Sequence, residues 1–196
     1  MSAAAEPSYL FVTVEEDAWT DRVPEVSLLC DQAVLSVLEA ACPALQGASV
    51  SLLLADDARV RELNRTYRDQ DKPTNVLSFP ATLTRPGETP RTAFEGVPLG
   101  LGDIVLAFET VTAEAAAQDK PIEHHLIHLV VHGTLHLLGY DHMTDDEAAV
   151  MEGLEVRILA GLGIADPYHD GSGPDGPASD GPESDGPKPN GIIGHG

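Results

Sequence analysis

The chain is short of basic residues, of cysteines and of long apolar runs. Its 196 residues include 11 Lys and Arg against 32 Asp and Glu, giving a formal net charge of −21 that should repel nucleic acid at long range. No apolar run approaches the roughly 18 residues that a membrane-spanning helix needs. The N-terminus, MSAAAEPSYLF, lacks the basic start and the uninterrupted apolar stretch of a signal peptide. We therefore expect no membrane-spanning segment and no membrane partner.

The two cysteines, Cys30 and Cys42, are twelve positions apart. If both lie on one helix, the rise per residue separates them by about 18 Å, which is far beyond disulfide reach. We expect both to be small buried side chains of a protein from a reducing compartment, and the cytoplasm is the expected location.

Low-complexity sequence occupies the C-terminal end, where Asp-Gly-Pro recurs at positions 175, 180 and 185. This segment has almost no apolar content and cannot bury enough surface to order itself. From Asp170 onward it holds five acidic residues and one lysine, so subtracting its charge of −4 still leaves −17 on the rest of the chain. We expect a flexible N-terminus at residues 1–7, one globular domain at 8–168 and a disordered acidic tail at 169–196.

Strand-like runs alternate with helical patterns along the body of the chain. The expected strands are residues 9–14, 48–54, 75–79 and 101–108. The expected helices are residues 24–42, 57–68, 108–120, a segment that opens at Pro121, and 148–162, the last behind a capping-box pair, Thr144 and Glu147. The proline-rich segment 81–98 should be a long loop, of a kind that is often functional or mobile. The interleaving predicts an α+β fold in which a single mixed β-sheet packs against helices.

Three of the eight histidines fall in one stretch, VVHGTLHLLGYDH, at residues 130–142. His132 and His136 are four residues apart and so share one face of a helix. Gly139 can end that helix, and His142 follows three residues later. Zinc is commonly bound by neutral imidazoles, and a catalytic site uses three protein ligands with an open fourth position. The spacing predicts a zincin-like three-histidine metal site, because core-lining histidines do not explain three in this arrangement.

The same spacing occurs in the metzincin peptidases, whose motif is His-Glu-x-x-His-x-x-Gly-x-x-His. The glutamate that acts there as general base corresponds to Gly133 in this chain. A peptidase without it loses the general-base contribution, on the order of 10²–10⁴-fold, so the peptidase interpretation is disfavoured. Farther back on the same helix, His128 and His124 are either partners of the metal ligands or, as is commoner, ordinary core or surface residues.

The helix expected over residues 57–68 carries a row of basic side chains on one face. The row consists of Arg61, Arg65 and Arg68, extended by Lys72, with Arg59 close by. The opposite, core-facing stripe consists of Val60, Leu63 and Tyr67. Arginine matches the geometry of phosphate oxygens, so the row is a candidate phosphate contact. The alternative, weighed equally for Arg59, Arg61 and Arg65, is a solvated face paired with the acidic residues Asp56, Asp57, Glu62 and Asp69.

Three segments resemble the YbeY family of bacterial endoribonucleases. They are LNRTYRDQDKPTNVLSFP (63–80), LGDIVLA (101–107) and VVHGTLHLLGYDH (130–142), and they come in the family's order. The resemblance covers roughly residues 8–168, which would then form a metal-dependent endoribonuclease domain. It implies a cytoplasmic, single-strand-specific RNase that acts in rRNA processing, notably at the 3′ end of the small-subunit rRNA, and in ribosome quality control. It also implies one Zn²⁺ per chain on His132, His136 and His142, and Arg68 as the catalytic arginine.

The implied partners are single-stranded rRNA, the small ribosomal subunit and its assembly proteins; the oligomeric state is not predicted. In such an enzyme Arg68 would stabilise negative charge that develops on the phosphorane oxygens. Asp103 either lines the cleft or belongs to a turn at a strand end, and Asp141 is a candidate to orient a ligand imidazole. Two other functions stay open, namely a ribosome assembly factor whose metal is structural and a metallopeptidase-like hydrolase.

Overall fold

The computed structural model describes residues 9–45, 47–91 and 99–168. In chain order the elements are β1 (Tyr9–Val14), α1 (Ala18–Arg22), α2 (Val26–Ala41), β2 (Ala48–Ala55), α3 (Asp57–Arg68), β3 (Val76–Pro80), β4 (Leu99–Ala107), α4 (Phe108–Ala117), α5 (Ile122–Leu137) and α6 (Asp145–Gly161). The predicted N-terminal segment, the predicted tail and residues 92–98 of the predicted loop lie outside the described residues. None of the described helices is both long and apolar enough to span a membrane.

The four strands form one mixed sheet in the order β1-β2-β4-β3. Strands β1, β2 and β4 are mutually parallel, and β3 runs antiparallel to β4 at the edge. Hydrogen bonds from Ala107 N to Asn75 O and from Ala81 N to Leu101 O lie at the two ends of the β3–β4 pair. Because such bonds alternate along an antiparallel strand, the carbonyl of Ser78 points outward from the open edge of β3. The predicted single mixed sheet is confirmed.

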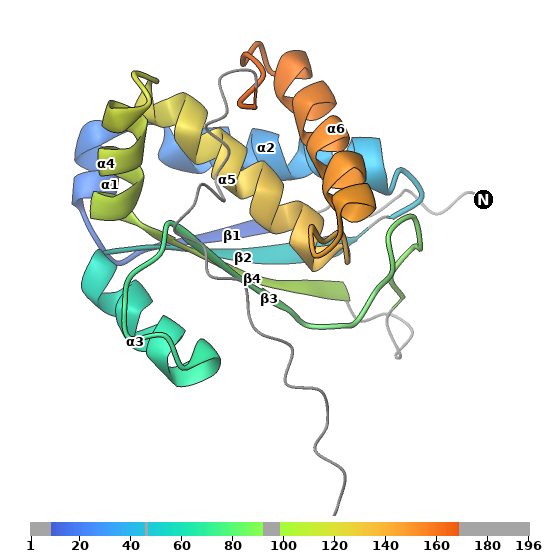
Figure 1. The fold of residues 1–196 in the computed structure, drawn as a ribbon, viewed down its shortest axis with the longest axis horizontal. Coiled ribbons are helices and arrows are strands. Elements are labelled where there is room, and N and C mark those ends of the chain that lie inside the picture. Colours follow the sequence, from blue (N-terminus) through green and yellow to red (C-terminus); the bar gives the residue numbers. More distant parts are fainter. Residues whose placement is uncertain (1–8, 46, 92–98, 169–196) are drawn as a thin grey trace, which may run out of the picture.

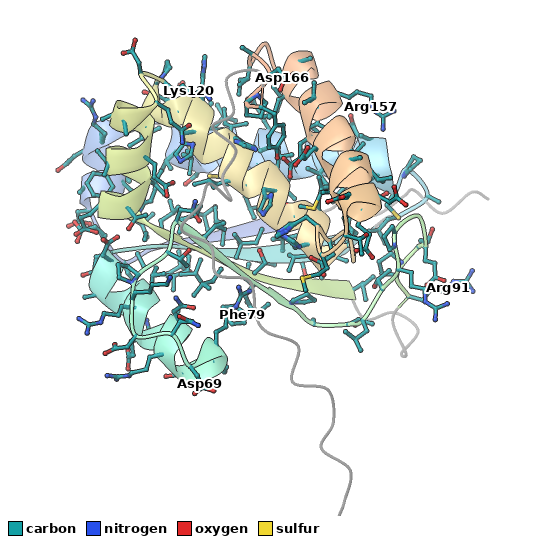
Figure 2. The ribbon with its side chains drawn as sticks, in the orientation of Figure 1. Asp69, Phe79, Arg91, Lys120, Arg157 and Asp166 are labelled. Carbon is teal, nitrogen blue, oxygen red and sulfur yellow. The ribbon has the colours of Figure 1, made fainter. Side chains whose placement is uncertain are left out.

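The two faces of the sheet are covered unequally (Figure 1). Helices α2, α4, α5 and α6 lie on one face, and α3 lies on the other. Side chains alternate along β2, so Val50, Leu52 and Leu54 join the main core under the helix layer, while Ala55 belongs to a smaller cluster under α3. In Figure 2, Lys120 and Asp166 lie on the helix-layer side, whereas Asp69 lies at the end of α3. The sheet thus has one thickly covered face and one partly open face.

Several sequence predictions differ from the structure in detail. The helix predicted at residues 24–42 begins at Val26, and the short α1 before it was missed. Trp19 of α1 is buried, and its indole N–H donates to Ala55 O at the end of β2 at 3.0 Å, which anchors the helix to the sheet. The prediction that Tyr67 faces the core is wrong, since the side chain is 67% exposed and its ring meets Phe79 edge-on at 5.3 Å between centroids.

Both cysteines are free and buried, as predicted. Cys30 lies within α2, and Cys42 is the residue that ends it. Burial raises the pKa of the Cys30 thiol to about 12, with the neighbouring Asp31 acting in the same direction. A thiol with so high a pKa is unreactive at neutral pH, so Cys30 is a packing residue.

Candidate metal centre

Helix α5 carries His132 and His136 through the middle of the helix layer. It packs against β3 and β4 on one side and against α2, α4 and α6 on the others, which is why its residues are apolar almost all round. The helix ends at Leu137, and Gly139 follows with φ of 85°. A Cβ on Gly139 would lie 1.9 Å from the carbonyl oxygen of Thr84. Only glycine therefore permits this turn, which brings His142 back toward the helix.

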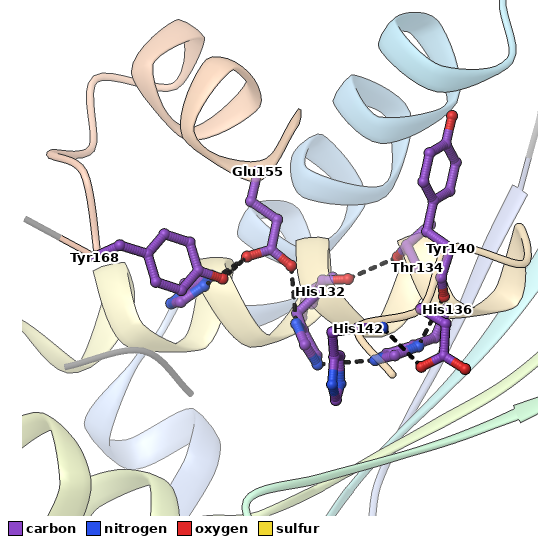
Figure 3. A network of polar contacts seen from close by, with 10 residues as sticks. His132, Thr134, His136, Tyr140, His142, Glu155 and Tyr168 are labelled. Carbon is purple, nitrogen blue, oxygen red and sulfur yellow. Dashed lines mark hydrogen bonds and ion pairs between the residues drawn. The ribbon is translucent and has the colours of Figure 1, made fainter. Parts of the chain in front are cut away.

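The structure brings the three predicted ligands together (Figure 3). One ligand atom from each of His132, His136 and His142 lies within 4.8 Å of the others. The ring centroids of His132 and His136 are 4.5 Å apart, and that of His142 is 5.7 Å and 5.1 Å from them. His132 is buried, while His136 and His142 are partly exposed, so the cluster opens to solvent on one side. This group of three imidazoles could hold a metal ion.

Two of the rings are oriented by hydrogen bonds at Nδ1. The Nδ1 atom of His132 lies 2.8 Å from Glu155 Oε1, and that of His136 lies 3.0 Å from Tyr140 O. Because both partners are acceptors, each Nδ1 donates to its partner and each Nε2 is left facing the histidine cluster. The two Nε2 atoms are 3.0 Å apart. Two imidazole nitrogens that face each other at hydrogen-bond distance, with a third imidazole beside them, form a donor set that fits a metal favouring imidazole ligands, as zinc does.

Glu155 on α6 is the residue of this site that sequence analysis missed. Its carboxylate is fully buried and also accepts hydrogen bonds from His128 Nε2, at 3.1 Å, and from the hydroxyl of Tyr168. Burial by itself raises the pKa of Glu155, but the hydrogen bonds from His128 and His132, together with the Coulombic attraction of these two imidazoles, outweigh it and hold the pKa far below its usual range. Glu155 is therefore an ionised carboxylate in the core.

A signal for Glu155 was present in the sequence. It falls at i+4 from Met151 and next to Leu154, on the apolar stripe of α6, where a carboxylate needs a buried partner. Asp141, the carboxylate considered for this role, instead accepts a hydrogen bond from the backbone N–H of His142 at 2.8 Å. Asp141 thus shapes the turn, whereas Glu155 contacts a ligand imidazole. His128 contacts the same carboxylate, and His124 is exposed.

Gly133, which replaces the peptidase glutamate, lies on the side of α5 that faces the sheet. A Cβ there would lie 3.0 Å from Ser78 Oγ and 3.2 Å from two carbons of Ile104. This side of the helix has no room for a glutamate side chain next to the metal ligands. The absence of the peptidase general base is therefore a consequence of the close packing of α5 on β3 and β4.

Arg68 is the last residue of α3 and contacts the edge strand β3. The next residue, Asp69, has φ of 56° and turns the chain away. The Nη2 atom of Arg68 donates to the outward-pointing carbonyl of Ser78, at a long 3.5 Å. Since Ser78 Oγ faces Gly133 on α5, the same residue of β3 contacts Arg68 on one side and the histidine helix on the other.

The rest of the basic row is largely paired with acids. Arg61 makes a bidentate contact with Asp71 at 2.8 and 3.0 Å, and Arg59 contacts Glu62 at 2.8 Å. The hydrogen bonds with Asp71 raise the pKa of Arg61, and those with Arg61 lower the pKa of Asp71. Among the described residues, no carboxylate lies within ion-pair distance of Arg65 or Arg68. The solvated-face interpretation therefore holds for Arg59 and Arg61.

A groove of about 510 Å³ lies on the opposite, partly open face of the sheet. Asp103, Tyr67 and Phe79 are among its lining residues, and none of the three histidines is. Asp103 lies inside β4, so it belongs neither to a strand-end turn nor to the histidine cluster. This groove is thus separate from the candidate metal centre.

Comparison with known proteins places this site in a family. The model of the family Endoribonuclease YbeY matches residues 15–163. The chain belongs to this family. The matched residues include the three histidines, Arg68 and Glu155 but end before Tyr168.

Individual relatives agree with this assignment. A YbeY endoribonuclease of Azorhizobium caulinodans is 54% identical over 160 residues, which are 80% of this chain and 94% of the relative. Another, from Rhodospirillum rubrum, is 50% identical over 175 residues and 86% of each chain. The solution structure of TM1509 from Thermotoga maritima is similar at a TM-score of 0.47 and 22% identity, over 79% of this chain and 91% of that one. The assignment to the YbeY family is based on the family model and the curated relatives.

Proposed function

We propose that this protein is a zinc-dependent endoribonuclease that cleaves single-stranded RNA. The observation that carries the proposal is the convergence of His132, His136 and His142 in a chain of the YbeY family, whose curated relatives are named endoribonucleases. One Zn²⁺ per chain is the proposed cofactor. It would supply Lewis-acid chemistry toward water and phosphoryl oxygens.

The residues of the chain have separate tasks in this proposal. The three histidines hold the metal, and Glu155 fixes the His132 ring with its Nε2 toward it. Arg68 donates guanidinium N–H groups to the non-bridging phosphate oxygens and stabilises the charge that develops there during cleavage. Gly133 keeps α5 close to β3, so that Ser78 and Arg68 stay beside the histidine helix.

The proposed substrate is rRNA, notably the 3′ end of the small-subunit rRNA, with the small ribosomal subunit and its assembly proteins as partners in the cytoplasm. Arg65 and Arg68 lie in the last turn of α3, and Arg68 contacts Ser78 O at the open edge of β3, in a chain of net charge −21. Two arginines in one helical turn would contact few phosphates, which fits one flexible strand better than the two backbones of a duplex. We also propose that residues 8–168 form the catalytic domain.

The proposal is tested by metal analysis and digestion of matched substrates. The full-length protein should carry close to one Zn²⁺, cleave a single-stranded RNA, and leave a duplex of the same sequence and casein intact. The double variant His132→Ala/His136→Ala should lose most of the metal and the cleavage. His124→Ala, an exposed histidine of the same helix, is the control and should behave like wild type. Full metal content in the double variant, or digestion of casein without RNA, would contradict the proposal.

The assembly-factor function has one observation in its favour. Arg59 and Arg61 are occupied by carboxylates, which leaves few cations for RNA in a strongly acidic chain. In that case the metal is structural, so its removal lowers the melting temperature while purified wild-type protein has no RNase activity. The same metal analysis and digestion separate the two functions.

A further inference from the structure

A polar network links the metal ligand His132 to Tyr168, the last residue that the structure describes (Figure 3). Glu155 is at its centre. One carboxylate oxygen, Oε1, accepts from His132 Nδ1 at 2.8 Å. The other, Oε2, accepts from His128 Nε2 at 3.1 Å and from the Tyr168 hydroxyl. Both oxygens of the carboxylate are therefore held by protein donors.

The energetics of Glu155 call for a positive charge nearby. An ionised carboxylate in the core is costly unless hydrogen bonds and an opposite charge compensate it. Burial lowers the pKa of His128, against the opposing effect of Glu155. Among the described residues, no Lys or Arg pairs with Glu155. The cation that the three histidines could hold is the charge that this carboxylate complements through the His132 ring.

Tyr168 is brought to Glu155 by a segment that folds back after α6. Ile164 is buried, the Lys120 ammonium contacts Pro167 O at 3.4 Å, and the Tyr168 ring meets His128 edge-on at 5.7 Å between centroids. A carboxylate side chain can rotate about its last bond, and a ligand imidazole is only as well oriented as its acceptor. The donors on Oε2 remove that freedom and keep Oε1 on His132 Nδ1.

We propose that Tyr168 is a positioning residue of the metal centre, which acts with His128 to hold Glu155 on His132 and so strengthens metal binding. The stretch that leads into the acidic C-terminal sequence is thereby coupled to a metal ligand. This inference rests on the metal site of the proposed function but is independent of RNA cleavage, because metal binding is measured without RNA.

The test is a chelator competition for Zn²⁺ on the full-length protein after metal removal. Glu155→Gln should weaken zinc binding by roughly 10–100-fold, and Tyr168→Phe by roughly tenfold, the range found for partners of metal-binding histidines. Tyr67→Phe removes the same hydroxyl from an exposed ring outside the network and should bind zinc like wild type. Tyr168→Phe removes a single atom, so it carries the test even if Glu155→Gln does not fold.

Imidazole ¹⁵N NMR of the metal-free protein separates positioning from mere stability. Wild-type His132 should be the tautomer protonated at Nδ1, and Tyr168→Phe should shift it toward a mixture of tautomers. Zinc affinity of Tyr168→Phe within twofold of wild type would overturn the proposal, as would a lowered melting temperature with an unchanged His132 tautomer. If wild type cleaves no RNA while Tyr168→Phe still weakens zinc binding, the positioning role stands and the proposed function fails.

Discussion

Replacing Gly139 with alanine should damage both the fold and the metal centre. At φ of 85° the backbone is left-handed, which costs a residue with a Cβ roughly 1–2 kcal/mol. The added Cβ would also lie 1.9 Å from Thr84 O, and forcing backbone apart at such a contact costs about 1–3 kcal/mol. The free energy of unfolding should therefore fall by about 2–5 kcal/mol, a large share of a typical total of roughly 5–15 kcal/mol.

The assay is urea unfolding of the metal-free protein, followed by zinc titration. Gly153→Ala is the matched control, because Gly153 lies inside α6 with nothing within 4 Å of its Cβ position. It should stabilise the protein by about 0.5–1 kcal/mol, the helix preference for alanine over glycine. Gly139→Ala should also bind zinc more weakly, since the turn supplies His142 and the carbonyl that orients His136. An unfolding free energy within about 0.5 kcal/mol of wild type would refute this account of the turn.

Three further predictions concern the surroundings of the site. Gly133→Glu restores the peptidase motif but should lower the unfolding free energy by at least about 3 kcal/mol. The variant should show no peptidase activity, and a stable variant that digests casein would contradict the packing explanation. Arg61→Ala should leave the melting temperature and the saturated cleavage rate unchanged, because Arg61 is already paired with exposed Asp71; a loss of rate at saturating RNA would give Arg61 a catalytic role. Deleting residues 170–196 should change neither the melting temperature nor the metal content, and a large drop in melting temperature would move the predicted domain boundary.

The fold could be predicted where local signals were strong. Asp56 caps α3 through the backbone N–H of Arg59, and the predicted bounds of 57–68 match those observed. Thr144 and Glu147 form the predicted capping box of α6. Local side chains of this kind satisfy the free N–H groups of a helix end, so a short motif is enough. Helix α1 has only five residues, too few for a periodic pattern, and was missed.

The sequence predicted the candidate metal ligands but not the residues that orient them. Two histidines one turn apart and a third after a glycine turn are local geometry, which spacing alone can express. Glu155 and Tyr168 reach the site through tertiary packing, 23 and 36 residues after His132. Tyr67 was misplaced because the helical stripe predicts a core-facing side chain, whereas the sheet under the end of α3 is partly open.

The central claim is that the histidine-bound metal and Arg68 act together on RNA. The most direct measurement is single-turnover cleavage of a short single-stranded RNA by wild type, Arg68→Ala and His136→Ala, with the zinc content of each sample determined. Arg68→Ala should keep wild-type zinc and lose cleavage by a factor on the order of 10²–10³, and Arg68→Lys should recover little because an ammonium lacks the bidentate fork. His136→Ala should lose both zinc and cleavage. Wild-type rates from Arg68→Ala beside an inactive His136→Ala would remove Arg68 from the mechanism, and wild-type rates from both variants would contradict the whole account.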